Sequence, residues 1–292
     1  MDAKIAALCA AALVGGAAPA DLRAEWIADA EAAFFFDDNV TRGQRESDVK
    51  SDAALLARAT GGYYFQLGER TGATLGVTVQ REQHLRYAGL SATGAGPSVA
   101  VRTKLGLGPQ APWIRLAASA LRLDYDDDLR TGWLLSASAG AGARVSERVG
   151  LRAEVLLERH VADQRRALVR NISGAAFDVE GASLSLGADY MVTRATSVSA
   201  AYTYRTGDVV SSTRRHASIF GVSSAIARDP VFGPDTIAYK LDAHSHVVEL
   251  RVSHALSERS SLNVGFARSF TYGDGGNDYY GNSLSASLIY NF

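Results

Sequence analysis

Long stretches of this sequence alternate apolar and polar side chains with a period of two. In residues 247–255, valine and leucine occupy one parity, and charged or small polar side chains occupy the other. The same pattern recurs in residues 149–158 and 182–190, and helical periodicity fits none of these windows. Because successive side chains of a β-strand point to opposite faces, these segments predict strands with one apolar and one polar face.

Turn-forming residues divide the chain into strands through breaks that alternate in length. Short breaks lie near residues 68–70, 108–112, 146–148, 193–195 and 257–259. Longer, more polar breaks lie near residues 37–50, 87–93, 126–129, 162–173, 207–241 and 273–278. They leave about twelve strands, an even number, each much longer than the roughly 5 to 6 residues of an ordinary soluble strand. In the fifth strand the apolar parity slips near residues 118–121, which predicts a β-bulge.

The first twenty residues have the layout of a secretory signal peptide. Lys4 precedes an apolar run from Ile5 to Val14, and the small-residue pattern Ala18-Pro19-Ala20 follows. We expect cleavage after Ala20 and a single β-barrel domain over residues 21–292; the alternative is a short buried or anchoring helix. Cys9, the one cysteine of the chain, would leave with the signal peptide.

Aromatic placement distinguishes two architectures that share this alternation. A soluble barrel or sandwich buries its apolar parity, whereas a transmembrane barrel turns it to lipid and carries aromatic rings at the strand ends. Aromatic residues gather at the predicted strand ends: at one rim Trp26, Tyr63, Tyr64, Phe65, Trp113, Tyr190, Tyr290 and Phe292, and at the other Phe34, Phe35, Phe36, Tyr87, Tyr125, Phe177, Tyr204, Phe270, Tyr272, Tyr279 and Tyr280. The sequence therefore predicts an all-β, transmembrane, antiparallel up-and-down barrel with short periplasmic turns and longer extracellular loops.

The last fourteen residues alternate strictly and end on an aromatic side chain. One parity carries Leu284, Ala286, Leu288, Tyr290 and Phe292. This segment resembles the C-terminal signal strand of Gram-negative outer-membrane β-barrels. The resemblance implies an outer-membrane location among lipid and lipopolysaccharide. It also implies that the barrel-assembly machinery recognises Leu288, Tyr290 and Phe292.

A second resemblance lies at the end of the first predicted strand. The sequence Phe36-Asp37-Asp38-Asn39-Val40 is similar to a motif in several barrels associated with the export of surface polymers or surface proteins. It implies a barrel that works with a protein partner.

Charged residues of both signs fall on the parity that faces the predicted lumen. They are Arg58, Arg102, Lys104, Arg152, Glu154, Glu158, Asp189, Arg205, Glu249 and Arg251. Such charges either line a polar pore that selects small solutes by charge, or pair with one another and plug a closed barrel. Twelve strands imply a backbone diameter of roughly 25 Å, so large solutes are excluded in either case.

Two loops carry further candidate chemistry. The break at residues 207–241 is long enough to fold inward, cap the mouth or bind a ligand, or it is a mobile surface loop. Four aspartates, Asp124, Asp126, Asp127 and Asp128, form an acidic tip that could hold a divalent cation bridging lipopolysaccharide or could be a solvated turn.

The residues offer little for catalysis or metal binding. A rim hydrolase would use a serine beside an oriented histidine, with His244, Ser245, His246, His160 and His254 as candidates. Strand geometry, however, puts Ser245 on the face opposite to His244 and His246. We therefore expect no catalytic residue, no metal site and no cofactor.

The charge balance excludes one further class of function. With 30 Lys and Arg against 31 Asp and Glu, the chain lacks the basic excess of a nucleic-acid-binding protein. We expect a monomeric outer-membrane barrel acting as a narrow pore for small polar solutes. The alternatives are a plugged structural or export-associated barrel with a partner, and a rim-located hydrolase.

Overall fold

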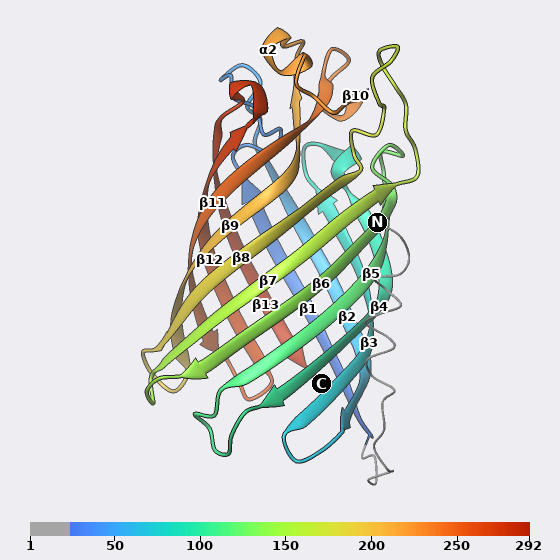
Figure 1. The fold of residues 1–292 in the computed structure, drawn as a ribbon. Coiled ribbons are helices and arrows are strands. Elements are labelled where there is room, and N and C mark those ends of the chain that lie inside the picture. The colour runs from blue at the N-terminus through green and yellow to red at the C-terminus, as the bar shows by residue number, and fades with distance from the viewer. Residues whose placement is uncertain (1–23) are drawn as a thin grey trace.

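The computed structural model describes residues 24–292, which fold into one closed antiparallel barrel (Figure 1). Its twelve strands are β1 (Ala24–Asp37), β2 (Asp52–Gln66), β3 (Thr71–His84), β4 (Ala92–Lys104), β5 (Trp113–Tyr125), β6 (Gly132–Arg144), β7 (Val149–Ala162), β8 (Val179–Met191), β9 (Thr196–Thr213), β11 (Ile237–Ala255), β12 (Ser260–Gly273) and β13 (Tyr279–Asn291). The predicted signal peptide at residues 1–20 lies outside the described residues.

The barrel closes where its first and last strands meet. Each strand pairs with the next, and β1 also pairs with β13, from Asp29 opposite Asn291 to Asp37 opposite Ser283. This pairing removes both edges of the sheet, so every strand has a partner on each side. The predicted up-and-down barrel of about twelve strands is confirmed.

The apolar parity faces outward. Leu75, Val77 and Val79 of β3 keep 55%, 55% and 52% of their surface exposed, although they lie mid-strand. The same parity exposes leucine or valine on β2, β5, β6, β7, β8, β9, β11, β12 and β13. A soluble sandwich or barrel would bury these side chains, so the pattern is that of a transmembrane barrel. Within residues 24–292, no helix has the length and apolar character needed to cross a bilayer.

The two ends of the barrel differ as the sequence predicts (Figure 1). The strand connections at 67–70, 105–112, 145–148, 192–195 and 256–259 lie at one end, here called the short-turn end. The connections 38–51, 85–91, 126–131, 163–178, 214–236 and 274–278 lie at the other, the long-loop end.

One predicted loop boundary is wrong. The break expected at residues 207–241 is shorter, because β9 and β11 stay paired as far as Thr213 and Ile237. β8, in contrast, leaves β9 at Gly207, whose φ of +124° suits glycine and whose added Cβ would lie 2.4 Å from the carbonyl oxygen of Glu180. Beyond this point β9 and β11 continue as a ribbon, to which the short strand β10 (Ala225–Arg228) adds.

The bulge predicted in the fifth strand is also wrong. β5 keeps one register against both β4 and β6, although its pairing with β4 is interrupted at Gly96 and Pro97. The parity slip arises because Leu121 and Leu123 point inward, where a Cβ on Gly94 would lie within 3.3 Å of both. Small residues on β4 therefore make room for two apolar side chains inside the barrel.

The aromatic belts form, although some predicted members face inward or lie in loops. At the short-turn end Trp26, Tyr63, Tyr190, Tyr290 and Phe292 are exposed on the outer face, and Trp26 and Tyr63 meet edge to face at 5.2 Å. At the long-loop end the exposed outward rings include Phe34, Tyr204, Tyr272 and Tyr280, together with Trp133 and Tyr202, which the sequence prediction omitted. Aromatic residues that lie inside or within the loops include Tyr64, Phe35, Tyr87, Tyr125, Phe177 and Tyr279.

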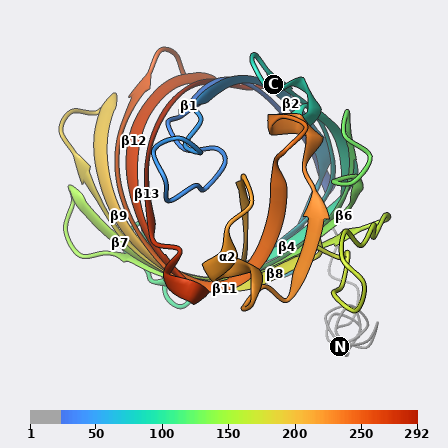
Figure 2. The ribbon, with the colours of Figure 1, turned by 90° about the horizontal axis from the view of Figure 1, so that it is seen from above.

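Residues of the long-loop end pack into a buried core of their own. One cluster joins Leu129, Phe177 and Ala227 from three different loops. A second gathers Ile219, Ile226 and Tyr239 around the ribbon extension. Figure 2, looking from above, shows the segment around α2 (Ala217–Phe220) and the loop after β1 lying within the ring of strands. The loops thus form an ordered cap over this mouth.

Candidate functional site: a polar lumen under a folded cap

All of the charged residues predicted to face the lumen lie on the inward parity. On each of their strands the opposite parity carries exposed apolar or small side chains, such as Leu151, Val155 and Leu157 on β7. The inward set is Arg58, Arg102, Lys104, Arg152, Glu154, Glu158, Asp189, Arg205, Glu249 and Arg251.

Several of these charges pair with one another along the wall. Arg152 Nη1 on β7 lies 2.5 Å from Asp189 Oδ1 on β8, and Arg251 Nη2 lies 2.5 Å from Glu249 Oε1 on β11. Each pair joins neighbouring positions on the wall and does not bridge the lumen. The charges therefore compensate one another without filling the barrel.

The basic side chains without a carboxylate partner are held in other ways. The Arg102 guanidinium stacks over the Trp113 ring at 4.6 Å, and Trp113 faces inward opposite Gly142. Trp113 therefore faces the lumen, and the prediction that it belongs to the outer aromatic belt is wrong. Arg205 crosses over Gly181 and donates to the backbone oxygen of Asp208 at 2.9 Å.

Hydroxyl pairs continue the polar lining between the charges. Thr60 and Thr78 lie 3.2 Å apart, and Ser119 and Ser136 lie 2.8 Å apart. Ser185 with Thr203 and Ser245 with Thr271 repeat this contact at 2.8 Å each. Cross-strand hydroxyl pairs satisfy part of each group's hydrogen-bonding capacity, and of these pairs Ser245 and Thr271 are buried.

The inward charges remain accessible to solvent. The side chains of Arg152 and Asp189 are each 42% exposed, and those of Arg251 and Glu249 are 49% and 33% exposed. A plug of packed ion pairs would bury such groups. At the level of these residues the lumen is therefore a polar, solvent-accessible space.

Several lumen residues escaped the sequence prediction. Glu31 on β1 accepts from Arg58 Nη1 at 3.2 Å, and Arg115 on β5 lies directly opposite Arg102. Near the long-loop end the ring of His84 lies between Asp52 and Glu82, with 3.0 Å to each. Strict parity counting from Arg58 across to β1 would have found Glu31, but the run of three phenylalanines at residues 34–36 hides the parity of that strand.

The motif at the end of β1 builds the turn that sends loop 38–51 into the mouth. Asn39 Nδ2 donates to the carbonyl oxygens of Gly43 and Tyr280, both at 3.0 Å, and its Oδ1 accepts from the Gly43 amide at 3.0 Å. Asp38 accepts from the backbone and side-chain nitrogens of Asn282 at 2.7 and 2.6 Å. These side chains fix the loop to β13, so within this chain the motif has a direct structural role.

Loop 38–51 then reaches across to the end of β9. The Ser212 amide donates to the Thr41 carbonyl at 2.8 Å, and Ser211 Oγ donates to the Arg42 carbonyl at 2.8 Å. Arg214 Nε lies 3.0 Å from Asp48 Oδ1. Because β13, β12 and β11 separate β1 from β9 in the sheet, these contacts span part of the mouth.

A buried ion pair joins loops 126–131 and 214–236 of the cap. Asp229, which follows β10 and is 0% exposed, accepts from Arg130 Nη2 of loop 126–131 at 2.7 Å and from Ser212 Oγ at 2.5 Å. The Arg130 guanidinium also stacks over the Phe177 ring at 4.3 Å. Arg130 thereby connects loops 126–131, 163–178 and 214–236.

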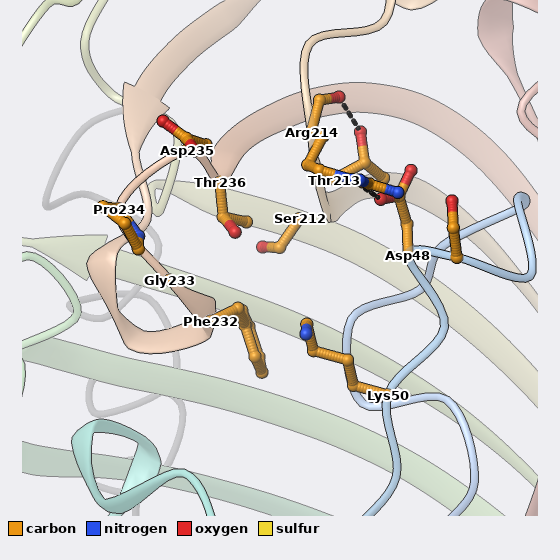
Figure 3. A pocket seen from close by; sticks show the side chains of 11 residues that line it. Asp48, Lys50, Ser212, Thr213, Arg214, Phe232, Gly233, Pro234, Asp235 and Thr236 are labelled. Carbon is orange, nitrogen blue, oxygen red and sulfur yellow. Dashed lines mark hydrogen bonds and ion pairs between the residues drawn. The ribbon is translucent and has the colours of Figure 1, made fainter.

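Two adjoining cavities lie in the cap. The smaller, about 170 Å³, separates Asp48 and Lys50 of loop 38–51 from Phe232, Gly233 and Thr236 of loop 214–236 (Figure 3). The larger, about 620 Å³, shares Arg214, Pro234, Asp235 and Thr236 with it and is also lined by Arg45, Leu168, Arg215, Arg228 and Ile237.

The acidic tip at residues 124–128 is occupied by protein contacts. Asp126 pairs with Arg81 at 3.4 Å, and Asp127 pairs with Arg130. Within residues 24–292 the structure contains no cluster of three or more carboxylate, histidine or cysteine side chains arranged for a metal ion.

The candidate hydrolase residues lie apart. His246 Nδ1 is 2.7 Å from the Tyr202 hydroxyl on the outer face, where the rings of His244 and Tyr272 stack at 5.3 Å. Ser245 points to the other face and contacts Thr271 at 2.8 Å. The predicted separation of Ser245 from the two histidines is confirmed, and the histidines belong to the outer aromatic belt.

Comparison with known proteins finds similarity in structure alone. No protein-family model and no curated protein matches the sequence. An outer-membrane channel from Pseudomonas putida F1 is similar with a TM-score of 0.54 and 10% identity, over 95% of this chain and 100% of that chain. The NanC porin gives 0.48 and 6% over 90% and 100%, and the outer-membrane channel DcaP of Acinetobacter baumannii gives 0.44 and 8% over 95% and 99%. At such identities the similarity shows the fold and nothing further.

Proposed function

We propose that this protein is an outer-membrane pore for small polar solutes. The observation that carries the proposal is the solvent-exposed, charged lining of a closed barrel whose outer face is apolar. Inward charges of both signs stay accessible, and hydroxyl pairs line the wall between them. Such a lining hydrates an aqueous path through the barrel. The channel from Pseudomonas putida F1 that shares this fold is described as an outer-membrane channel, which supports the proposal.

The proposal includes the surroundings of the barrel. The long-loop end faces outward from the cell and the short-turn end faces the periplasm, as is usual for such barrels. Lipid and lipopolysaccharide cover the apolar belt, and the barrel works as a monomer. Leu288, Tyr290 and Phe292 point outward in the last strand, where the barrel-assembly machinery would recognise them. Export depends on the predicted signal peptide. We assign no catalytic role and no cofactor.

Conductance in planar lipid bilayers tests the proposal. We expect folded protein to give discrete current steps in potassium chloride. We also expect proteoliposomes to admit small sugars and to exclude oligosaccharides, because the lumen is narrow. As a control for folding, the protein should migrate differently on a denaturing gel before and after boiling. Folded protein that never passes current would contradict the pore.

The cap gives one specific reason to keep the plugged barrel as a second candidate. Loop 38–51 and loop 214–236 are joined across part of the mouth by hydrogen bonds and by the Arg214–Asp48 ion pair. A plugged or export-associated barrel would retain a protein partner through purification in mild detergent and would conduct no ions. For the rim hydrolase, His246→Ala should abolish any phospholipid or peptide turnover, and an unchanged rate removes that alternative.

A further inference from the structure

The larger cavity of the cap is strongly basic. Arg45 comes from loop 38–51, Arg214 and Arg215 follow β9, and Arg228 ends β10. Asp235 is the single carboxylate in this lining. Three separate segments thus bring four guanidinium groups to one cavity of about 620 Å³ that is open to solvent.

Most of these arginines are not neutralised by the protein. Arg214 pairs with Asp48 at 3.0 Å, but the side chains of Arg45, Arg215 and Arg228 make no ion pair within residues 24–292. All four are exposed. Elsewhere at the long-loop end, basic side chains pair with carboxylates: Arg122 pairs with Asp163, and Lys240 pairs with Asp208. The cavity therefore concentrates positive charge in a protein whose net charge is −1.

The positive charge of this cavity affects the pKa of a neighbouring histidine, His216. Burial lowers the pKa of His216, and the Arg45 guanidinium lowers it further, while Asp48 has the opposite effect. A positive field disfavours a second cation, which is the same effect that attracts an anion. His216 is itself held by Ser218 Oγ at 2.8 Å from its Nδ1.

We infer that this basic cavity binds small organic anions carrying two or more carboxylate or phosphate groups, and that it selects them for the pore. Guanidinium groups bind both kinds of oxyanion through paired hydrogen bonds. Leu168, Pro234 and Ile237 supply an apolar wall for a carbon skeleton. Beyond the shared residues, the adjoining smaller cavity adds Lys50 and Asp48 to the charged lining. The inference rests on the proposed pore for the direction of transport, but binding does not require conduction.

Titration calorimetry of the folded protein in detergent tests the inference directly. The probes are citrate, its uncharged trimethyl ester, and purified lipopolysaccharide as a lipid-borne source of phosphate. We expect citrate to bind in low salt, its affinity to fall as salt rises, and the ester not to bind. In the double variant Arg215→Gln with Arg228→Gln, citrate affinity should fall at least tenfold.

Matched variants distinguish the effect of charge in the cavity from the effect of the protein's total charge on citrate binding. Arg148→Gln with Arg259→Gln removes the same charge from the short-turn end and should leave citrate binding unchanged. Arg215→Lys with Arg228→Lys keeps the charge but loses the paired hydrogen bonds, so it should bind citrate less tightly than the wild type and more tightly than the glutamine variant. Citrate binding by this variant also shows that the cap still folds. Equal loss in the two glutamine variants, or no citrate binding by the wild type, would overturn the inference. Binding of lipopolysaccharide with none of citrate would also overturn it, because the site would then be a lipid contact.

Conductance distinguishes the failure of this site from the failure of the pore. Current through wild-type protein without any citrate binding would leave the pore standing and remove the anion site. Citrate binding by a protein that never conducts would do the reverse.

Discussion

At the scale of single residues, the ion pair between Arg130 and Asp229 is the contact on which the cap depends most. Asp229 is fully buried, and besides Arg130 it has Ser212 as a side-chain partner, while its Oδ1 has no partner within the described residues. Removing one partner of a buried pair costs about 3–5 kcal/mol, because the remaining charge is uncompensated. We therefore expect this ion pair to hold the loops of the cap together.

Arg130→Ala should release the cap without unfolding the barrel. We expect faster hydrogen exchange at residues 126–131 and 214–236, measured by mass spectrometry, with unchanged exchange in the mid-barrel strands. Adding Asp229→Asn removes the stranded charge, so the double variant should exchange more slowly than Arg130→Ala alone. Unchanged exchange in the single variant would show that the pair does not close the cap.

The sequence predicts which side chains of a strand face the lumen, because strand parity determines this. It does not predict which side chains of different loops contact one another. Arg152 and Glu249 could be placed in the lumen because a strand offers two faces. Nothing in the sequence connects Arg130 with Asp229, since they are 99 positions apart and neither belongs to a periodic segment. The positions of Trp113 and of Leu121 were also missed, because both are apolar or aromatic side chains inside a polar lumen.

At the scale of elements, the turn after β1 shows how a short motif directs a whole loop. Asn39 uses both ends of its amide to bind Gly43 and Tyr280, and its Oδ1 also accepts from Thr41 Oγ1 at 3.2 Å. Each such bond contributes about 0.5–1.5 kcal/mol net. The loop enters the mouth because these bonds fix its first residues.

Asn39→Ala should therefore free loop 38–51. We expect larger current fluctuations and a higher mean conductance, because the loop no longer occupies a fixed place in the mouth. Gln44→Ala is the matched control, since it removes one exposed hydrogen bond, to Gly276, from the same loop. If both variants conduct as the wild type does, loop 38–51 does not restrict the pore.

The extension of β9 and β11 has its own test at Gly207. A side chain there would meet the Glu180 carbonyl and would strain a backbone of positive φ, at a cost of about 1–3 kcal/mol for the backbone alone. We expect Gly207→Val to lower the urea midpoint of unfolding. Gly150→Val is the control, because the nearest atom to its added Cβ is 3.8 Å away. Equal midpoints would mean that the strands adjust at Gly207.

Element boundaries were predictable to the extent that turns interrupt the alternation. The short turns and five of the long connections lie where polar and glycine-rich breaks stand in the sequence. The ribbon of β9 and β11 was not predicted. Beyond Gly207 its residues are covered by loops, so apolar and polar side chains no longer alternate along these strands. Val209, Tyr239 and Leu241 are buried there in the cap.

At the scale of the whole molecule, the fold creates three environments. An apolar belt covers the outside of the barrel, a charged wall surrounds the lumen, and a folded cap covers part of the long-loop mouth (Figure 2). Along the wall of the lumen, several carboxylates and guanidinium groups pair with one another. The basic cavity in the cap departs from that pairing, which is why it stands out as a site.

The central claim is that ions and solutes pass through the lumen, and modification of a single cysteine tests it most directly. In a chain with Cys9→Ala, Ser185→Cys places a thiol on the lumen wall, and Leu186→Cys places one on the outer face of the same strand. A negatively charged thiosulfonate reagent should lower the single-channel conductance of the Ser185→Cys protein and leave that of the Leu186→Cys protein unchanged. Equal conductance of the two proteins after modification, or current in neither, would contradict the account.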